Sequence, residues 1–334
     1  MSLPPIEVPT GAMRFNSDSQ KLEYYDGAQW LQVSTFSPNL NGGARGVFGS
    51  GGTEPAAPFN VIDYITISST GNAIDFGDLI STGTIRAACS SSTRGIFTGG
   101  QSGSAPSTNA LDFITISSTG NAQDFGDQTA GKQNQAGCSS ATRGLFMGGT
   151  PSAGYLNVIE YITIASTGNA QDFGDLFGSV AQQAAFSSST RGINSGGVGP
   201  SGNSNVYAFI TISTLGNASY FGDLVVARHG CSGASNVIRG LTMGTADPGN
   251  AIEFITISTL GNGIDFGDLT VARRNSCGAA SPTRAVCAGA DYSPASLNVI
   301  DYVTIMSTGN AVDFGDRTGS YGGMCGLSNA HGGL

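Results

Sequence analysis

The chain is poor in the residues from which most catalytic and metal sites are built. Its 334 residues include only two histidines, His229 and His331, and they do not have the spacing of a metal-binding pair. Six cysteines are too few for a small disulfide-stabilised scaffold. Neither a nucleophile-elbow motif nor a phosphate-binding glycine loop occurs in the sequence. We therefore expect a protein that is not an enzyme and has no catalytic residues, no metal site and no cofactor.

Positive charge is also scarce. The sequence has 14 lysines and arginines against 23 aspartates and glutamates, a net charge of −9. A nucleic-acid-binding surface needs a basic patch, so we expect no nucleic-acid partner. No apolar run approaches the ~20 residues of a membrane span, and residues 1–10 lack the features of a signal peptide. We expect a soluble protein without membrane insertion.

Glycine, in contrast, is abundant, and much of it belongs to a repeat. The 51 glycines are roughly twice the ordinary usage. The triplet Phe-Gly-Asp recurs six times, at intervals of 45 to 49 residues, beginning at Phe76, Phe125, Phe173, Phe221, Phe266 and Phe314. An Ile-Thr-Ile or Val-Thr-Ile motif, a Gly-Asn pair and an arginine recur in the same register. The sequence thus contains six copies of one unit.

Each copy predicts four short strands. Residues 157–165 are rich in β-branched and aromatic side chains. Large apolar groups stand on both faces of this strand, so its sheet must be covered on both sides. Residues 166–169 form a turn, the next strand ends at residues 172–175, and two more strands run through 184–186 and 191–193. Every copy therefore predicts one four-stranded sheet.

A period near 48 residues with four strands is typical of a β-propeller, in which radially arranged sheets bury one another. We therefore predict an all-β protein with a six-bladed propeller in residues 41–334. The first copy begins at Arg45, the start of a second strand. Residues 324–329 match residues 88–93, the strand that the first copy lacks. The C-terminal strand is therefore expected to complete blade one.

The repeat resembles the kelch motif. Residues 94–100 read Arg-Gly-Ile-Phe-Thr-Gly-Gly, a second strand that ends in a glycine pair, and spaced aromatic residues follow in the third and fourth strands. The likeness extends from Arg45 to Leu334, with Phe where kelch repeats usually have Trp. It implies a kelch-like propeller.

Residues 1–40 do not repeat and predict a short β-meander. Its strands are expected at residues 13–15, 21–25 and 29–33, with turns at 16–19 and at Asp26-Gly27. A sheet this small buries its aromatic residues poorly, so it needs a partner. The candidate docking residues are Phe15, Tyr24, Tyr25 and Trp30.

The N-terminal segment also resembles a known module. Residues 11–30 are similar to the short N-terminal module of phage tail-fibre and other virion proteins. The repeat Ile-Asp-Tyr-Ile-Thr-Ile-Ser-Ser-Thr-Gly-Asn-Ala at residues 62–73 resembles repeats in structural proteins of phages that infect aquatic bacteria, including cyanobacteria. The resemblance implies a virion structural protein.

Strand alternation assigns the turns to two rims. The uniform Ser/Thr-Arg and Ser-Thr-Gly-Asn turns share the rim at which the chain enters at Arg45, and the loops of the opposite rim vary between copies. Binding residues concentrate on loops carried by rigid scaffolds. The variable rim is therefore the candidate recognition surface, with neutral drift as the alternative. Its candidate residues are Phe59, Gln101, Tyr155, Asn203, Asp247 and Tyr292.

The repeated polar residues predict structural roles. The six repeated arginines could form an anion site, but pairing with the six Phe-Gly-Asp aspartates is favoured. The Asp-Phe-Gly-Asp segment supplies too few oxygens for calcium and is interpreted as a turn. The asparagine before each third strand is expected to clamp the strand entry. Five cysteines are expected at one position of successive first strands, and Cys277 and Cys287 are the pair to test for a disulfide.

These observations favour a phage virion structural protein, such as a tail-fibre, collar or decoration component. Its head would dock to other virion proteins, and its propeller would be exposed on the particle and bind a host surface glycan or receptor or another virion protein. We expect a symmetric homo-oligomer on the particle. The alternatives are a bacterial surface or secreted kelch-like protein-binding scaffold and, less favoured, a propeller glycan hydrolase.

Overall fold

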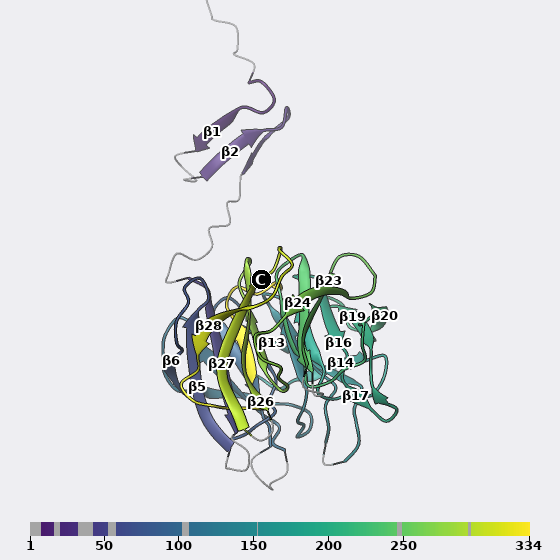
Figure 1. Cartoon of the computed structure of the whole chain (residues 1–334). Coiled ribbons are helices and arrows are strands. Elements are labelled where there is room, and N and C mark those ends of the chain that lie inside the picture. The colour runs from purple at the N-terminus through teal and green to yellow at the C-terminus, as the bar shows by residue number, and fades with distance from the viewer. Residues whose placement is uncertain are drawn as a thin grey trace, which may run out of the picture. The chain divides into compact units, whose positions relative to one another are not determined.

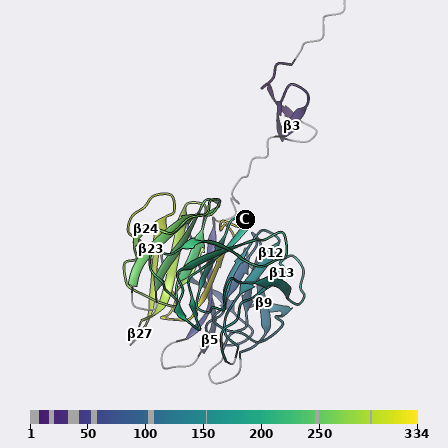
Figure 2. The same cartoon turned by 90° about the vertical axis from the view of Figure 1, so that its right-hand side faces the viewer.

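The computed structural model describes residues 8–16, 21–32, 43–52, 58–101, 107–151, 153–245, 249–292 and 295–334. The described residues form β-strands and no helix, so the protein is all-β. The chain divides into two compact units, Met1–Asn41 and Gly42–Leu334, which we call unit 1 and unit 2. Figures 1 and 2 show the strands from two perpendicular directions.

Unit 1 contains one antiparallel sheet of three strands in the order β1-β2-β3. They are β1 (Met13–Asn16), β2 (Lys21–Tyr25) and β3 (Trp30–Gln32). The Asp26 side chain accepts hydrogen bonds from the backbone N–H groups of Ala28 and Gln29, both at 2.8 Å, and so closes the second turn. The predicted first turn lies largely outside the described residues.

Unit 2 contains six four-stranded antiparallel sheets, numbered here from the N-terminus. Sheet 1 consists of β29 (Cys325–Ser328), β4 (Arg45–Gly52), β5 (Pro58–Thr66) and β6 (Ile74–Asp78). Sheet 2 consists of β7 (Ala88–Ser90), β8 (Arg94–Thr98), β9 (Ala110–Thr115) and β10 (Gln123–Asp127). Sheet 3 consists of β11 (Ala136–Ser139), β12 (Arg143–Met147), β13 (Val158–Thr163) and β14 (Gln171–Asp175).

The remaining three sheets repeat this order. Sheet 4 consists of β15 (Ala184–Ser187), β16 (Arg191–Ser195), β19 (Val206–Thr211) and β20 (Ser219–Asp223), with a small extra hairpin of β17 (Val198–Gly199) and β18 (Gly202–Asn203). Sheet 5 consists of β21 (Ser232–Ser235), β22 (Arg239–Thr245), β23 (Gly249–Thr256) and β24 (Ile264–Asp268). Sheet 6 consists of β25 (Cys277–Ala280), β26 (Arg284–Tyr292), β27 (Ala295–Thr304) and β28 (Val312–Asp316).

Sheet 1 joins the two ends of unit 2. Its first strand, β29, comes from the C-terminus and pairs antiparallel with β4, so that Cys325 lies opposite Gly49 and Ser328 opposite Gly46. The backbone N–H of Arg45 also donates to Oδ1 of Asn329 at 2.8 Å. The C-terminal segment therefore supplies the strand that the first copy lacks. The match of residues 324–329 to residues 88–93 is wrong by two positions, because Leu327 and not Cys325 is equivalent to Cys89.

The first strands of the sheets contact one another in the cyclic order β7, β11, β15, β21, β25, β29 and back to β7. Shortly before each first strand in the sequence, one residue has a positive φ between 50° and 66°. These residues are Ile85, Asn134, Gln182, Gly230, Asn275 and Gly323. The backbone N–H of each of these residues donates to the carbonyl of its counterpart before the preceding sheet, at 2.5 to 3.2 Å. The six hydrogen bonds form a closed ring, because Ile85 donates to Gly323.

The turn after each third strand contacts the outer strand of the preceding sheet. For example, the N–H of Gly168 donates to the carbonyl of Phe125, and Oδ1 of Asn169 accepts from the N–H of Asp127. A Cβ added to Gly126 (φ 142°) would lie 2.6 Å from the carbonyl oxygen of Gly168. The Phe-Gly-Asp and Gly-Asn motifs recur together because they form the two halves of this contact, which supports their interpretation as structural residues.

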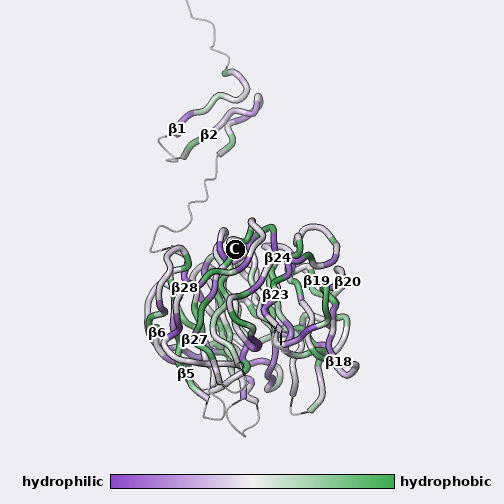
Figure 3. The backbone as a smooth tube through the Cα atoms, viewed as in Figure 1, coloured by the Kyte–Doolittle hydropathy of each residue, from purple (hydrophilic) through white to green (hydrophobic). Residues whose placement is uncertain are grey.

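The hydrophobic core consists of six clusters, each drawn from two neighbouring sheets. One cluster, for instance, joins Val47 and Phe76 of sheet 1 to Phe97 and Ile114 of sheet 2. Hydrophobic segments follow the strands of unit 2 (Figure 3). Every sheet is therefore covered on both faces, as the two-sided apolar pattern of residues 157–165 predicts.

Candidate functional site

The residues predicted for the variable rim lie where second strands lead into third strands or in the loops between them. Phe59 is in β5, Gln101 follows β8, Tyr155 precedes β13, Asn203 ends β18 and Tyr292 ends β26, while Asp247 lies outside the described residues. Among the four whose side chains the structure describes, Phe59, Gln101, Tyr155 and Asn203, no hydrogen bond or ring contact joins one to another. They are therefore distributed over several loops.

Two of these residues hold their own loops in place. The ring of Phe59 meets the ring of Tyr321 edge-on, with centroids 5.5 Å apart. Gln101 exchanges two backbone hydrogen bonds with Thr84, at 2.9 and 3.2 Å. Asn203, in the extra hairpin, is exposed, so it has the accessibility that a recognition residue needs.

The predicted docking residues of unit 1 fall on opposite faces of its sheet. Phe15 and Tyr24 share one face with Met13, and these three side chains are exposed by 66, 40 and 62%. On the other face Trp30 packs against Tyr25, with ring centroids 5.4 Å apart. The guanidinium of Arg14 lies 4.2 Å from the centroid of Trp30 and pairs with Glu23 at 2.9 Å. Met13, Phe15 and Tyr24 therefore form an exposed apolar face of this sheet.

The six repeated arginines stack on aromatic rings of the third strands, with the guanidinium carbon 4.3 to 4.9 Å from the ring centroid. The pairs are Arg45 on Tyr64, Arg94 on Phe113, Arg143 on Tyr161, Arg191 on Phe209, Arg239 on Phe254 and Arg284 on Tyr302. Each Nη1 also donates to a carbonyl of the next sheet, as Arg143 does to Ile212 at 2.7 Å. We name these six residues the arginine ring.

The prediction that the arginine ring pairs with the Phe-Gly-Asp aspartates is wrong. Arg45 lies opposite Thr66, at one end of sheet 1, whereas Asp78 lies opposite Val61, at the other end. Because neighbouring strands run antiparallel, the start of a second strand and the end of a fourth strand lie at opposite ends of their sheet. The ion pairs of the described residues do not include the arginine ring.

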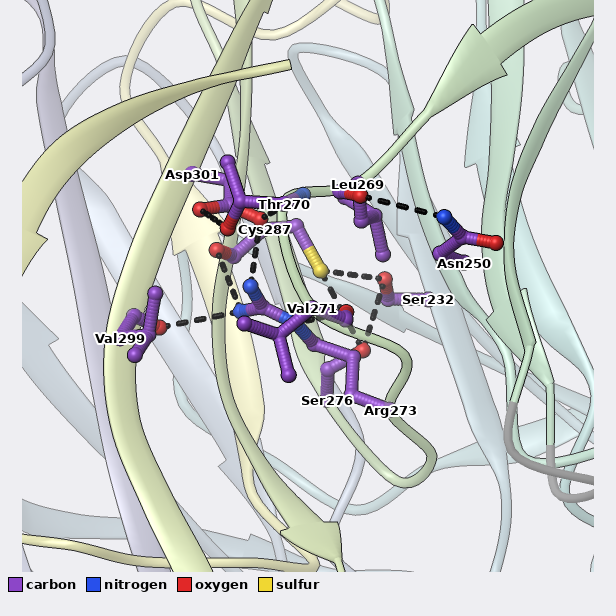
Figure 4. Close-up of polar contacts among 10 residues, drawn as sticks. All are labelled: Ser232, Asn250, Leu269, Thr270, Val271, Arg273, Ser276, Cys287, Val299 and Asp301. Carbon is purple, nitrogen blue, oxygen red and sulfur yellow. Dashed lines mark hydrogen bonds and ion pairs between the residues drawn. The ribbon is translucent and has the colours of Figure 1, made fainter. Parts of the chain in front are cut away.

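Five third strands carry a buried carboxylate that pairs with a cation from the loop before the sheet. The pairs are Arg317–Asp63, Arg86–Asp112, Lys132–Glu160, Arg228–Glu253 and Arg273–Asp301. In Figure 4 the fully buried Arg273 contacts Asp301 and donates to the carbonyl of Val299 at 3.0 Å. Thr270 donates its N–H and hydroxyl to the same carboxylate, at 3.0 and 2.7 Å. Each pair therefore anchors the loop between two sheets.

The pairs differ in length, and sheet 4 has none. Arg86 and Asp112 are 4.0 Å apart, and burial raises the pKa of Asp112 and lowers the pKa of Arg86. In sheet 4 the carboxylate position holds Ala208 and the loop position equivalent to Arg273 holds Val180. Both charges are absent together, which avoids an unpaired buried ion.

These ion pairs were not predicted from the repeat motifs. In five of the six copies an acidic residue stands three positions before the threonine that ends the third strand, and this spacing could have identified it. The cations do not recur in the same way. Each distance is counted from the phenylalanine of the preceding Phe-Gly-Asp triplet. Arg86 stands ten residues after that phenylalanine, Arg273 stands seven residues after it, and Arg317 stands three residues after it.

The prediction that five cysteines share one position is also wrong. The equivalent positions, opposite the second residue after each repeated arginine, hold Cys89, Cys138, Phe186, Ala234, Ala279 and Leu327. Cys277 lies opposite Ala288, and Cys287 belongs to the opposite face of the same sheet. The six cysteines are free and buried. Cys287 instead contacts the hydroxyls of Ser232 and Ser276, at 3.4 and 3.3 Å (Figure 4).

Serine hydroxyls connect the ends of the first strands. Each donates at 2.6 to 2.8 Å to a carbonyl of the preceding sheet: Ser90 to Ser328, Ser139 to Ser90, Ser187 to Ser139, Ser235 to Ser187 and Ser328 to Ala280. Ala280 occupies the sixth place and has no hydroxyl, and the carbonyl of Ser235 accepts instead from the N–H of Gly332 at 2.9 Å. The C-terminal residues thus complete this series.

His331 closes the same end of the first strands. Its Nε2 lies 3.1 Å from the carbonyl oxygen of Ser90, and its Nδ1 accepts from the N–H of Gly333 at 3.0 Å. Burial lowers the pKa of His331 to about 4. A neutral ring with the proton on Nε2 satisfies both contacts. His331 lines a cavity of about 50 Å³ together with serine, glycine and apolar residues, among them Phe186 and Leu327, and the cavity has room for a few water molecules.

Comparison with known proteins adds no family to this description. No protein-family model matches the sequence, and no curated protein is significantly similar to it. In the described part of the chain, no helix is long and apolar enough to cross a membrane. The same residues contain no group of three or more His, Cys, Asp or Glu side chains arranged to hold a metal ion.

Proposed function

We propose that unit 2 is a six-bladed, kelch-like β-propeller and that the protein is a phage virion structural component, of the tail fibre, collar or decoration type. Unit 1 docks to another virion protein, and the propeller binds a host surface glycan or receptor or a further virion protein. The protein stands exposed on the particle, in symmetric copies.

The observation that carries the propeller proposal is the cyclic order of the contacts between sheets. The ring of backbone hydrogen bonds includes one residue before every first strand, and Ile85 donates to Gly323 across the two ends of unit 2. The six apolar clusters follow the same order. A linear stack would leave two apolar faces uncovered.

The binding role is supported by how the repeated residues are used. The arginine ring, the Gly-Asn turns and the buried carboxylates hold neighbouring sheets together. The loops of the variable rim, at the opposite end of the sheets from the arginine ring, differ in sequence between copies. A rigid scaffold with variable loops suits recognition. In unit 1, the exposed face of Met13, Phe15 and Tyr24 suits docking, because a three-stranded sheet is too small to bury it.

Mass spectrometry and cryo-electron microscopy of purified phage particles test this function. We expect peptides of this chain at a copy number comparable to other minor structural proteins, and density for a six-bladed disc on the outside of the particle. Recovery of the protein only from the bacterial envelope or culture medium would favour the alternative, a bacterial surface or secreted kelch-like scaffold.

A further inference from the structure

The turns next to the arginine ring, which the repeat predicts to be uniform, differ between sheets 1 to 3 and sheets 4 to 6. In sheets 1 to 3 these turns bear Ser, Thr and Ala, for example at residues 68–70, 91–93 and 165–167. In sheets 4 to 6 the equivalent turns bear five exposed aliphatic side chains. These are Leu215, Val237, Ile238, Leu260 and Met306, exposed by 59, 57, 46, 61 and 48%. We name these five residues the apolar arc.

Hydrogen bonds connect sheets 4, 5 and 6 next to the turns that carry the apolar arc. Nη1 of Arg191 donates to the carbonyls of Ile257 and Ser258, both at 3.0 Å, and so ties sheet 4 to the turn of Leu260. The N–H of Ile257 donates to the carbonyl of Ile238 at 2.9 Å. Nη1 of Arg239 donates to the carbonyl of Ile305, next to Met306, at 3.2 Å. The apolar arc is therefore held on a fixed backbone.

The size of the apolar arc fits a binding surface. With about half of each side chain exposed, the five residues present roughly 500 Å² of mostly apolar area, the size of the largest apolar patch on a typical monomer, which is often functional. A stable protein interface buries about 800 Å² on each partner. The apolar arc therefore supplies the centre of such an interface, and flanking polar residues must supply its border.

Three residues of the arginine ring belong to the sheets that carry the apolar arc. They are Arg191, Arg239 and Arg284, and no ion pair among the described residues includes them. Five other cations of unit 2 are already paired with buried carboxylates. In a chain with a net charge of −9, these three sheets therefore bring together guanidinium groups that have no carboxylate partner.

We propose that the apolar arc and its arginines bind a protein segment that bears aliphatic side chains flanked by carboxylates. Aliphatic side chains offer no flat ring for a sugar to stack on, which disfavours a glycan. A second copy docked rim to rim would bring like charges together, which is costly. An acidic, aliphatic segment matches both the apolar area and the charge. The surface belongs to unit 2 alone and does not depend on the virion assignment.

The full chain and two matched variants test this proposal. The arc variant, Leu215→Thr, Val237→Ser, Ile238→Thr, Leu260→Thr and Met306→Ser, introduces residues that sheets 1 to 3 carry in the same turns. The control variant, Ile74→Gln, Ile264→Gln and Val312→Gln, removes three similarly exposed side chains from outer strands, where Gln123 and Gln171 stand in other sheets. Both variants should keep the wild-type thermal stability, because the new residues already occur in equivalent places.

Three synthetic peptides serve as probes. The first has about 15 residues in which pairs of Leu alternate with pairs of Glu. In the second every Glu is replaced by Lys, and in the third every Leu is replaced by Ser. We expect the Leu/Glu peptide to bind at least tenfold more tightly than either counterpart, with an affinity that falls as salt rises. The arc variant should weaken binding at least tenfold, and the control variant less than twofold. Arg239→Gln should weaken binding and reduce its salt dependence, whereas Arg94→Gln should do neither.

Three results would overturn the proposal. They are no binding of the Leu/Glu peptide to the full chain, equal binding by the arc variant, and equal binding of the Lys-for-Glu peptide. Sedimentation velocity adds a fourth, since a dimer of the full chain that the arc variant abolishes would assign this surface to a second copy. These measurements use purified protein, so they stand apart from the particle experiments that test the proposed function.

Discussion

Ile85 has a backbone conformation that β-branched residues rarely adopt. Its φ is 53°, and the equivalent residues of the other sheets are Asn, Gln or Gly, which tolerate this region better. Its N–H and carbonyl are both part of the backbone ring, through Gly323 and Asn134. The ring therefore holds Ile85 in a strained conformation.

Replacing Ile85 with asparagine should stabilise the protein. Ile85→Asn relieves the strain and keeps both backbone hydrogen bonds, so the free energy of unfolding in urea should rise by about 1 kcal/mol. Asn134→Ile, the reverse change at an equivalent position, should lower it by a similar amount. A loss of stability in Ile85→Asn would mean that its side-chain packing outweighs the strain.

His331 predicts a specific dependence of stability on pH. Its pKa falls from 6.5 to about 4 on folding, because burial disfavours the charged ring. Between these two values the unfolded chain binds more protons, so the free energy of unfolding must decrease as the pH falls through this window. The contribution of neutral His331 is fully present above about pH 6.5.

The variant His331→Gln isolates this contribution. Glutamine keeps a donor and an acceptor but does not titrate, while the carboxylates titrate alike in both proteins. Between pH 7 and pH 4 the wild type should lose on the order of 3 kcal/mol more stability than His331→Gln in urea denaturation. Parallel pH profiles for the two proteins would contradict the buried, neutral state of His331.

At the scale of elements, the buried ion pairs fix the loops between sheets. Sheet 4 has no such pair, and the energetics of buried charges explain why this sheet can be stable without one. Removing one member of a buried pair leaves an uncompensated charge, whereas replacing both by apolar residues costs much less. In sheet 4 both positions hold apolar residues, Val180 and Ala208. In sheet 6 both positions hold charged residues, Arg273 and Asp301, and both are fully buried.

A double-mutant cycle tests this comparison. Asp301→Ala should lower the free energy of unfolding by about 3–5 kcal/mol, since it leaves Arg273 buried without a counter-charge. The double variant Arg273→Val, Asp301→Ala copies sheet 4 and should lose clearly less than the sum of the two single variants. Additive losses, measured by urea denaturation, would show that the two charges do not depend on each other.

The positions of strands could be predicted from the sequence because one register recurs six times. The strand expected at residues 157–165 is β13 (Val158–Thr163), and those expected at 184–186 and 191–193 are β15 and β16. The cysteine alignment failed because it matched residue types instead of the distance from Phe-Gly-Asp. Cys277 stands two residues, and Cys231 three, before the position that Cys89 occupies in its own sheet.

The contacts between sheets were harder to predict. The Gly-Asn and Phe-Gly-Asp motifs are visible in the sequence, but their mutual contact joins residues about 42 positions apart in two different copies. The ion pairs escaped notice because their cations come from three loop positions. The apolar arc could not be predicted, because it depends on how far its five side chains are exposed, and residue identity alone does not give their exposure.

At the scale of the whole molecule, two sets of contacts join the first and last parts of unit 2. The pairing of β29 with β4 completes sheet 1, and the hydrogen bond from Ile85 to Gly323 completes the backbone ring. If the sheets form a closed cycle, these contacts should open only when the whole unit unfolds. An open stack would instead fray at this junction.

Native-state amide hydrogen exchange of the six residues in the backbone ring tests this cycle most directly. We predict that the N–H groups of Ile85, Asn134, Gln182, Gly230, Asn275 and Gly323 exchange with one common free energy, equal to that of global unfolding. Deleting residues 325–334 should abolish the protection of all six together. Fast exchange at Ile85 and Gly323, with the other four still protected, would contradict the closed cycle.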